Sequence, residues 1–387
     1  MWLSDEQAYE IVGEHGSPVF VYSREHLRER ARELMALELP YGLTVRYAMK
    51  ANPHPEIIKL FADEGLHFDA SSSYEAAELL EQGVLGAHIS LASQQPAHSL
   101  PELLEAGVQY VATSMHQLQL FAAAAQSGAR VALRINPPHG NGDNNRVTTG
   151  GANSSFGLWH EYLDDALRLA AGKGVVIDRL HVHIGSGTDP SAWGEAMDDA
   201  LAIARRMPDV TTLDIGGGFK ASRYEGEKEA DMPAIAAMFA ERLQAFATET
   251  GRQLRLEIEP GTWLVAHAAI LLAEVVDIVD TGREGYTFLR LNTGLNDFIR
   301  PAMYGAQHRI SVLNDTAEQA QYVVVGHCCE SSDILTPAPN DPEAIAPRTL
   351  NKAAIGELVA IAGTGAYCNA FATTGYNAFP SAQKIFI

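Results

Sequence analysis

Eight short apolar runs alternate with helix-like segments along the first two thirds of this chain. The candidate strands are residues 44–49, 67–71, 88–93, 110–114, 131–136, 179–184, 212–217 and 255–260. The segments between them, such as YEAAELLEQG at 74–83, have the apolar spacing of amphipathic helices. Eight strand–helix units are typical of a (β/α)8 barrel of about 250 residues, whereas a doubly wound sheet would rarely supply eight consecutive units. We therefore predict an α/β chain with a TIM-like barrel.

The pattern changes after about residue 265, where strand-like runs follow one another without helices. These runs are residues 286–294, 308–314, 321–328, 356–363 and 383–387. Such a succession indicates a second, all-β domain, with which the early run PVFVYS could pair. We expect residues 1–28 to join the β-domain, residues 29–265 to form the barrel and residues 266–387 to form the β-domain.

The composition narrows the classes of function. The chain has 387 residues, of which 28 are Lys or Arg and 48 are Asp or Glu, for a formal net charge of −20. Such a surface repels phosphate backbones and anionic lipid, so we expect neither a nucleic-acid nor a membrane partner. The longest apolar stretch, 263–279, contains His267, Glu274 and Asp277, which argues against a spanning helix. The acidic N-terminus and three cysteines without a disulfide framework favour a reduced, cytoplasmic enzyme.

Polar residues follow several predicted strands at their carboxyl ends, where barrels of this kind carry catalytic groups. Lys50 ends the first strand, and an amine among apolar neighbours can have its pKa lowered until it attacks an aldehyde. His183 follows the sixth strand, the glycines 216–218 follow the seventh, and Glu259 follows the eighth. Each signal alone is weak, because a strand-end lysine is usually solvated and a glycine-rich turn is usually only a turn.

Together these residues supply an amine, a flat ring, an anion cradle and a carboxylate. Pyridoxal 5'-phosphate requires all four. Lys50 would form the Schiff base, and Glu259 would keep the pyridine nitrogen protonated. The phosphate would lie among Ser186 and Gly216 to Gly218. We predict this cofactor and no metal ion.

Seven segments occur in the order found in the fold-type III pyridoxal phosphate decarboxylases. They are YAMKANPHPEIIKLFADEGLHFDASS, HVHIGSG, DIGGGF, EPG, GLNDFIRPAMYGAQH, CESSDIL and GTGAY. The chain resembles this family over nearly its whole length, and most resembles the diaminopimelate decarboxylases, with ornithine and lysine decarboxylases as relatives. The resemblance implies an alanine racemase-like barrel, a β-sandwich or Greek-key second domain, and a head-to-tail homodimer with shared active sites.

The resemblance also assigns roles to individual residues. Cofactor contacts would be Lys50, Asp69, Arg134, His183, Ser186, Gly216, Gly217, Gly218, Glu259, Gly261 and Tyr367, with His183 stacked on the ring. Substrate contacts would be Arg300, Tyr304, Glu330, Asp333 and Tyr367. Cys329 would return a proton to the α-carbon and, like Glu330, would come from the other subunit. The adjacent Cys328 could be confused with it, but only Cys329 is followed directly by Glu-Ser.

The chain departs from the family where the substrate's distal end would bind. Thr262 and Phe379 stand where the family tends to have arginines, and Ala370-Phe371 replaces a Ser-Met pair. The distal pocket is therefore expected to be less cationic and more apolar.

Two substrate hypotheses remain. We favour decarboxylation of meso-diaminopimelate to L-lysine. The alternative is the same chemistry on lysine, ornithine, arginine, or a carboxylated polyamine or siderophore precursor. An amino-acid racemase shares the barrel and lysine but leaves CESSD unexplained, and a cofactor carrier would normally end after the barrel.

Overall fold

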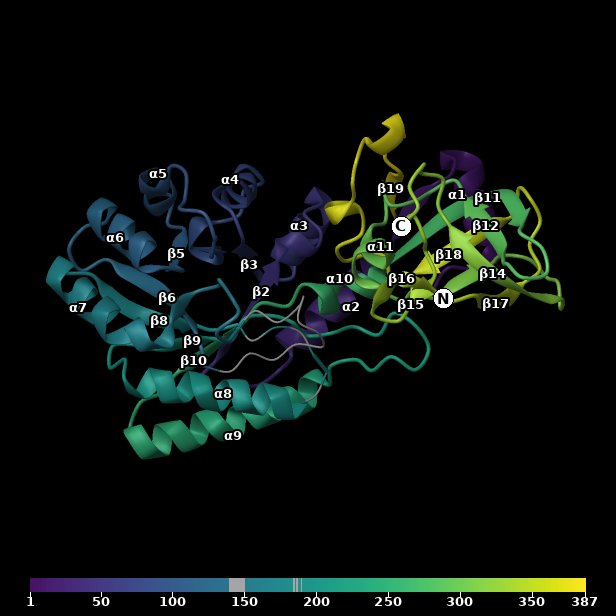
Figure 1. The fold of residues 1–387 in the computed structure, drawn as a ribbon. Helices are drawn as coiled ribbons and strands as arrows, with labels where there is room; N and C mark the ends of the chain where they lie inside the picture. The colour runs from purple at the N-terminus through teal and green to yellow at the C-terminus, as the bar shows by residue number, and fades with distance from the viewer. Residues whose placement is uncertain (139–149, 184, 186, 189) are drawn as a thin grey trace. The chain divides into compact units, whose positions relative to one another are not determined.

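This computed structural model describes residues 1–138, 150–183, 185, 187–188 and 190–387. The chain divides into two compact units. The β-unit comprises Met1–Leu27, Ala221–Glu227 and Val265–Ile387, and the barrel unit comprises Arg28–Lys220 and Lys228–Leu264 (Figure 1).

The barrel unit is built on a closed ring of eight parallel strands. The strands are β2 (Leu43–Ala48), β3 (His67–Ala70), β4 (Ile89–Leu91), β5 (Gln109–Ala112), β6 (Arg130–Asn136), β8 (Val176–His181), β9 (Thr212–Asp214) and β10 (Arg255–Ile258). They pair in the order β5-β4-β3-β2-β10-β9-β8-β6, and the pairing of β5 with β6 closes the ring. The short β7 (Leu158–Trp159) pairs with β6 outside the ring. The predicted barrel is confirmed, with each expected strand present.

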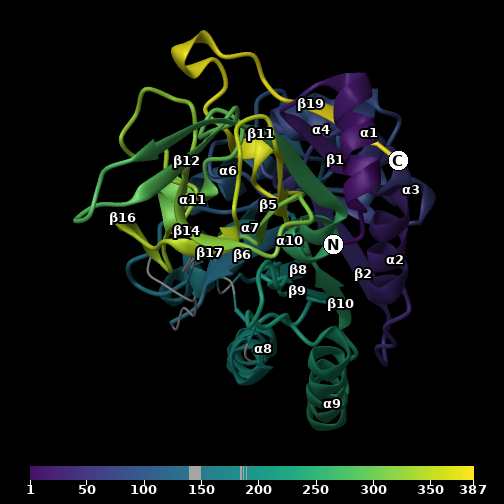
Figure 2. The same cartoon turned by 90° about the vertical axis from the view of Figure 1, so that its right-hand side faces the viewer.

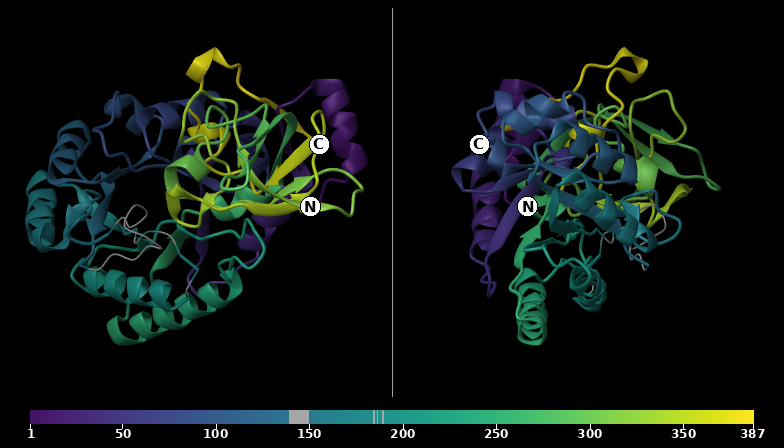
Figure 3. Two further views of the ribbon diagram at one scale, coloured as in Figure 1. Left: turned by 45° about the vertical axis from the view of Figure 1, so that its right-hand side comes forward. Right: turned by 90° about the vertical axis from the view of Figure 1, so that its left-hand side faces the viewer.

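Helices connect the strands of the ring. They are α3 (Pro55–Asp63), α4 (Ser73–Glu81), α5 (Leu100–Glu105), α6 (Met115–Ala124), α7 (Leu163–Lys173), α8 (Pro190–Arg205) and α9 (Met232–Thr250). The long helices α8 and α9 lie side by side, as Figures 1 and 3 show from several directions. Local signals set the ends of α9, because Asp231 caps its first turn and Gly251 leaves it in the left-handed conformation.

A buried ionic cluster occupies the barrel interior. Both carboxylate oxygens of Glu257 accept hydrogen bonds from Arg46, at 2.8 and 2.9 Å. Arg179 donates to the same carboxylate at 2.8 Å and to Ser90 Oγ at 2.9 Å. All four residues are buried. Because a buried charge without a partner costs several kcal/mol, these contacts fix the relative positions of β2, β8 and β10.

The β-unit contains a mostly antiparallel sheet (Figure 2). Its strands are β1 (Val19–Tyr22), β11 (Ala269–Asp280), β12 (Thr287–Leu291), β13 (Ile310–Val312), β14 (Gln319–Val325), β17 (Arg348–Asn351), β18 (Leu358–Ala362) and β19 (Gln383–Phe386). The N-terminal strand β1 pairs antiparallel with β11 and parallel with β19. This pairing brings together segments from both ends of the chain. The N-terminal helix α1 (Asp5–His15) precedes β1.

The apolar stretch at 263–279 forms most of strand β11, preceded by the short helix α10 (Thr262–Val265). Its pairing with β12 has a register shift between Val275 and Asp277, and Asp277 forms an ion pair with Arg290 of β12 at 3.0 Å. None of the helices among the described residues is long and apolar enough to cross a membrane.

Three smaller elements complete the β-unit. Helix α11 (Arg300–Tyr304) is a single short turn. Strands β15 (Pro337–Ala338) and β16 (Asp341–Ile345) pair antiparallel with each other. The helix α2 (Arg24–Met35) follows β1 and leads into the barrel unit.

Candidate active site

Lys50 lies at the carboxyl end of β2, in the short 3-10 turn Met49–Ala51. Its Nζ lies 3.2 Å from Asp69 Oδ2 and donates to Ser71 Oγ at 2.9 Å. The Lys50 side chain is 45% exposed, whereas that of Asp69 is 2% exposed. The amine is therefore held on the barrel rim by a buried carboxylate and remains accessible to a ligand.

The glycine loop after β9 packs directly on two other predicted site residues. Gly217 N–H donates to His183 Nδ1 at 3.2 Å, which assigns the proton of a neutral imidazole to Nε2. A Cβ on Gly216 would lie 2.3 Å from the same Nδ1, and Gly216 has a φ of 71°. A Cβ on Gly217 would lie 2.2 Å from the backbone oxygen of Glu259. Glycine is required at both positions because side chains would separate these strand ends.

The amide groups of this loop are partly used within the protein. Gly216 N–H donates to Asp214 Oδ1 at 2.9 Å, and Gly217 N–H donates to His183. Gly218, with a φ of 88°, accepts a bond from Gly187 N–H at 3.1 Å. The first two glycines thus provide close packing. Ser186, predicted to hold the phosphate, lies outside the described residues.

A buried group of titratable side chains lies beneath this loop. His181, Asp214 and Glu259 each offer a ligand atom within 4.8 Å of the others. Burial raises the pKa of Glu259 well above its ordinary value, and Asp214 and Asp69 raise it further. Burial, followed by the charge of Glu257, raises the pKa of Asp214 to about 6.

Within the described part of the chain, one oxygen of each carboxyl in this group is left without a donor. Among the described residues, Glu259 Oε1 and Asp214 Oδ2 have no hydrogen-bond partner. Burial lowers the pKa of His181 well below its ordinary value, so this imidazole is neutral. A protonated pyridine nitrogen would supply both a donor and a positive charge to Glu259. The same three ligand types suit a divalent cation, but the amine of Lys50 at the same rim favours an organic aldehyde.

Arg134 and Gly261 lie in the same unit. Arg134 is buried on β6, with its guanidinium carbon 5.2 Å from the centre of the Phe156 ring. Burial lowers its pKa, an effect that the carboxylates of Glu259 and Asp69 oppose. A Cβ on Gly261 would lie 3.0 Å from Ala51 Cβ, so this glycine allows close packing beside the turn that carries Lys50.

The remaining predicted site residues belong to the β-unit. Arg300 begins α11, and its Nε is buried with no hydrogen-bond partner in the described part of the chain. Tyr304 ends the same helix, and its ring stacks on that of Phe371, with the ring centres 6.4 Å apart and an angle of 10° between the ring planes. Tyr367 has a φ of 54°, a left-handed conformation that costs free energy for a non-glycine residue.

The two adjacent cysteines have different surroundings. Cys328 is buried, and burial together with Asp333 raises the pKa of its thiol to about 11. Cys329 is exposed, and its backbone N–H donates to Asn377 Oδ1 at 2.8 Å. Asp333 is buried and accepts bonds from the N–H groups of Leu295 and Cys328, at 2.7 and 2.8 Å. Its carboxylate thus orders the cysteine loop, residues 328–333. A contact between Asp333 and the substrate stays a prediction.

The C-terminal segment contacts this loop through residues that sequence reasoning missed. The Tyr376 hydroxyl donates to Glu330 Oε2 at 3.3 Å, beside the bond from Cys329 to Asn377. Phe379, which replaces an expected arginine, stacks on His327 with ring centres 3.6 Å apart. Tyr376 and Asn377 lie just before Phe379 in the sequence, and that departure from the family could have pointed to them.

Residues 24–266 match the family model described as "Pyridoxal-dependent decarboxylase, pyridoxal binding domain". Diaminopimelate decarboxylase of Streptomyces coelicolor is 33% identical, with 97% of this chain and 85% of that protein covered. A crystal structure of diaminopimelate decarboxylase is 27% identical at a TM-score of 0.90, with 99% and 92% of the two chains covered. Diaminopimelate decarboxylase from M. jannaschii in complex with L-lysine is 26% identical at a TM-score of 0.87, with 98% and 89% covered.

Proposed function

Because the chain belongs to the family of pyridoxal-dependent decarboxylases, we propose that it converts meso-diaminopimelate to L-lysine and carbon dioxide. The chain is a carboxy-lyase that acts on an amino acid and uses pyridoxal 5'-phosphate. The observation that carries the choice of substrate is the extent of the similarity, because proteins named diaminopimelate decarboxylase match both units. The lysine bound to the M. jannaschii protein is the expected product.

The barrel unit would hold the cofactor. When bound, pyridoxal phosphate accepts the electron pair that carbon dioxide leaves behind. Lys50 would bind the aldehyde carbon, with Asp69 and Ser71 orienting the amine through the contacts described above. Glu259 would hold a proton on the pyridine nitrogen, which would complete the hydrogen bonding of this buried carboxyl.

The ring and phosphate would be held by neighbouring groups. His183 would stack on the ring, since its Nδ1 is fixed by Gly217 and burial lowers its pKa, which keeps the imidazole neutral. Gly218, Ser186 and Tyr367 would bind the phosphate, and the strained backbone of Tyr367 supports a functional role there.

The β-unit would bind the substrate and return the proton. Arg300 would bind a substrate carboxylate, because its buried Nε needs an acceptor. Tyr304 would line the same site, and Glu330 would bind the distal ammonium. Cys329 would protonate the α-carbon because its side chain is accessible, whereas the Cys328 thiol is buried. We further propose a homodimer in which Cys329 and Glu330 complete the partner's site. We also propose a cytoplasmic location, which the three free cysteines support.

Two observations favour a second substrate class. Thr262 begins α10 where an arginine was expected, and Phe379 is stacked on His327. A distal pocket of this composition would suit lysine, ornithine, arginine, or a carboxylated polyamine or siderophore precursor, none of which needs a second bound carboxylate in the same place.

The test is release of carbon dioxide by the cofactor-loaded enzyme. The substrates are meso-diaminopimelate, both enantiomers of lysine and of ornithine, arginine, and a carboxylated polyamine. We expect turnover of meso-diaminopimelate that Lys50→Ala abolishes and that Lys59→Ala, on the exposed face of α3, leaves unchanged. Turnover of another substrate with none of meso-diaminopimelate would refute the proposed substrate. Exchange of the α-proton with solvent without gas release would indicate a racemase.

A further inference from the structure

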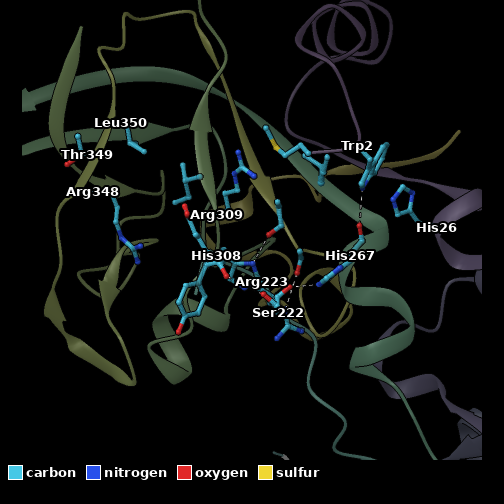
Figure 4. Close-up of a pocket in the computed structure, with 17 residues that line it drawn as sticks. Trp2, His26, Ser222, Arg223, His267, His308, Arg309, Arg348, Thr349 and Leu350 are labelled. Atoms are coloured by element: carbon cyan, nitrogen blue, oxygen red, sulfur yellow. Dashed lines mark hydrogen bonds between the residues drawn. The ribbon is translucent and has the colours of Figure 1, made fainter. Parts of the chain in front are cut away.

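The β-unit contains a cavity of about 780 Å³ (Figure 4). Its walls come from the N-terminal segment, from residues 222–225, and from β11, β13, β17 and β18. None of the β-unit residues assigned above to the reaction lines it: Arg300, Tyr304, Cys329, Glu330, Asp333 and Tyr367 all lie outside its lining. The cavity has the volume of a small-molecule site and is not accounted for by the decarboxylase chemistry.

The lining has an unusual charge for this protein. Arg223, Arg309 and Arg348 line the cavity, and Glu225 is the acidic residue among the lining residues. The chain as a whole has a formal net charge of −20. In the described part of the chain, neither Arg309 nor Arg348 forms an ion pair with a carboxylate. Three arginines therefore line one cavity together with a single acidic residue, and this charge balance favours an anion.

Two buried side chains in the lining have polar atoms without partners. Arg223 is 7% exposed, and its Nε donates to Gly363 O at 3.2 Å. His308 is 2% exposed, and its Nδ1 donates to Ala362 O at 2.9 Å, which leaves a lone pair on Nε2. Among the described residues, Arg223 Nη2 and His308 Nε2 have no hydrogen-bond partner. Buried polar groups are costly unless they are satisfied, so the unpaired donor of Arg223 favours an acceptor oxygen at this wall.

The opposite part of the lining is aromatic and apolar. The Trp2 indole is fixed because its Nε1 donates to His267 O at 3.0 Å and its ring lies 5.5 Å from that of His26. Ile270 adds buried apolar surface, and Leu350 adds more on the other side of the cavity, beside Arg348 (Figure 4). Figure 4 shows Trp2 and His26 at one side of the cavity and Arg348 at the other. A ligand that fills both parts has a charged end and an apolar body.

We propose that this cavity is a second ligand site, which binds a small organic anion with a carboxylate or phosphate group on an apolar or aromatic body. Arg309 and Arg348 attract the anionic group, Arg223 donates to it, and Trp2 contacts the body. The lining shares no residue with the set assigned to catalysis.

The test is calorimetric titration of the cofactor-loaded full-length enzyme with phenyl phosphate, benzoate and the neutral benzyl alcohol. We expect saturable binding of one anion per chain, weakened by salt, and no binding of the alcohol. The stronger of the two anions identifies the preferred head group. Absence of binding by both anions, or equal binding of the alcohol, would overturn the proposal.

Variants of arginines inside and outside the cavity show whether the binding occurs in this cavity. The double change Arg309→Gln and Arg348→Gln should weaken anion binding by about tenfold or more, as expected for lost charge-assisted contacts. Arg283→Gln removes an exposed arginine of the same unit outside the cavity and should leave the affinity unchanged. Melting temperatures without anion report whether each variant is folded. If a folded double variant binds the anions as tightly as the unaltered enzyme, the binding lies elsewhere and the proposal fails.

Discussion

Replacing Gly217 by alanine tests whether the loop after β9 must contact the end of β10. The new Cβ would lie 2.2 Å from the backbone oxygen of Glu259, whereas ordinary contacts begin at 3.4 Å. The two segments would have to separate by about 1.2 Å, the difference between these values, and a misplacement of about 1 Å can cost roughly 100-fold in rate. Overpacking of this kind also destabilises by about 1–3 kcal/mol. The bond from Glu259 N–H to Gly216 O, at 2.9 Å, would be strained directly.

The assay measures kcat/KM for carbon dioxide release, the dissociation constant of the cofactor, and the free energy of unfolding. We expect Gly217→Ala to lower kcat/KM by about 100-fold and to weaken cofactor binding, because Glu259 is moved from its position. Gly172→Ala is the control, since a Cβ at that position in α7 meets no atom within 4 Å. A Gly217→Ala enzyme with the activity and cofactor affinity of the control would refute the packing argument.

The remaining predictions concern the barrel interior and the cysteines. Glu257→Gln should lower the free energy of unfolding in urea by about 3–5 kcal/mol, because Arg46 and Arg179 would lose their buried counter-charge, and a loss below about 1 kcal/mol would contradict this. Burial alone would raise the pKa of Glu257, but Arg179 and Arg46 lower it to about 2. Its ionised form therefore stabilises the fold above its ordinary pKa, and the stability gap between the unaltered protein and Glu257→Gln should shrink as the pH falls from about 4.5 toward 2. Cys329→Ala should lower kcat by about 100-fold or more while Cys328→Ala leaves it near the unaltered value, and the reverse order would make Cys328 the proton donor.

The strands of the barrel were predictable because buried parallel strands have nearly continuous apolar runs, and these recur along residues 44–260. The ionic cluster inside the ring was not predictable from the sequence. Arg46, Arg179 and Glu257 are far apart in the chain, and their contact depends on the closure of β5 against β6 and the resulting strand order. The assignment of residues 221–227 to the β-unit likewise depends on long-range contacts that no local pattern reports.

The candidate site was partly predictable for a similar reason. Lys50, His183 and Glu259 stand at strand ends, and this position is visible in the sequence. His181 lies two residues before His183, at the end of β8, and Asp214 lies at the end of the neighbouring strand β9. Their proximity to Glu259 is set by the register of β8, β9 and β10. The bonds of Gly216 and Gly217 to side chains within the protein could not be inferred from a glycine run alone.

The identity of the lysine that binds the cofactor tests the proposed active site. Borohydride reduction of the loaded enzyme fixes the bond between the cofactor and its lysine, and peptide mass spectrometry then locates it. We expect a pyridoxyl group on Lys50 and its absence from the Lys50→Ala enzyme. Modification of a different lysine, or an equal yield in the variant, would contradict the assignment of the barrel rim around Lys50 as the active site.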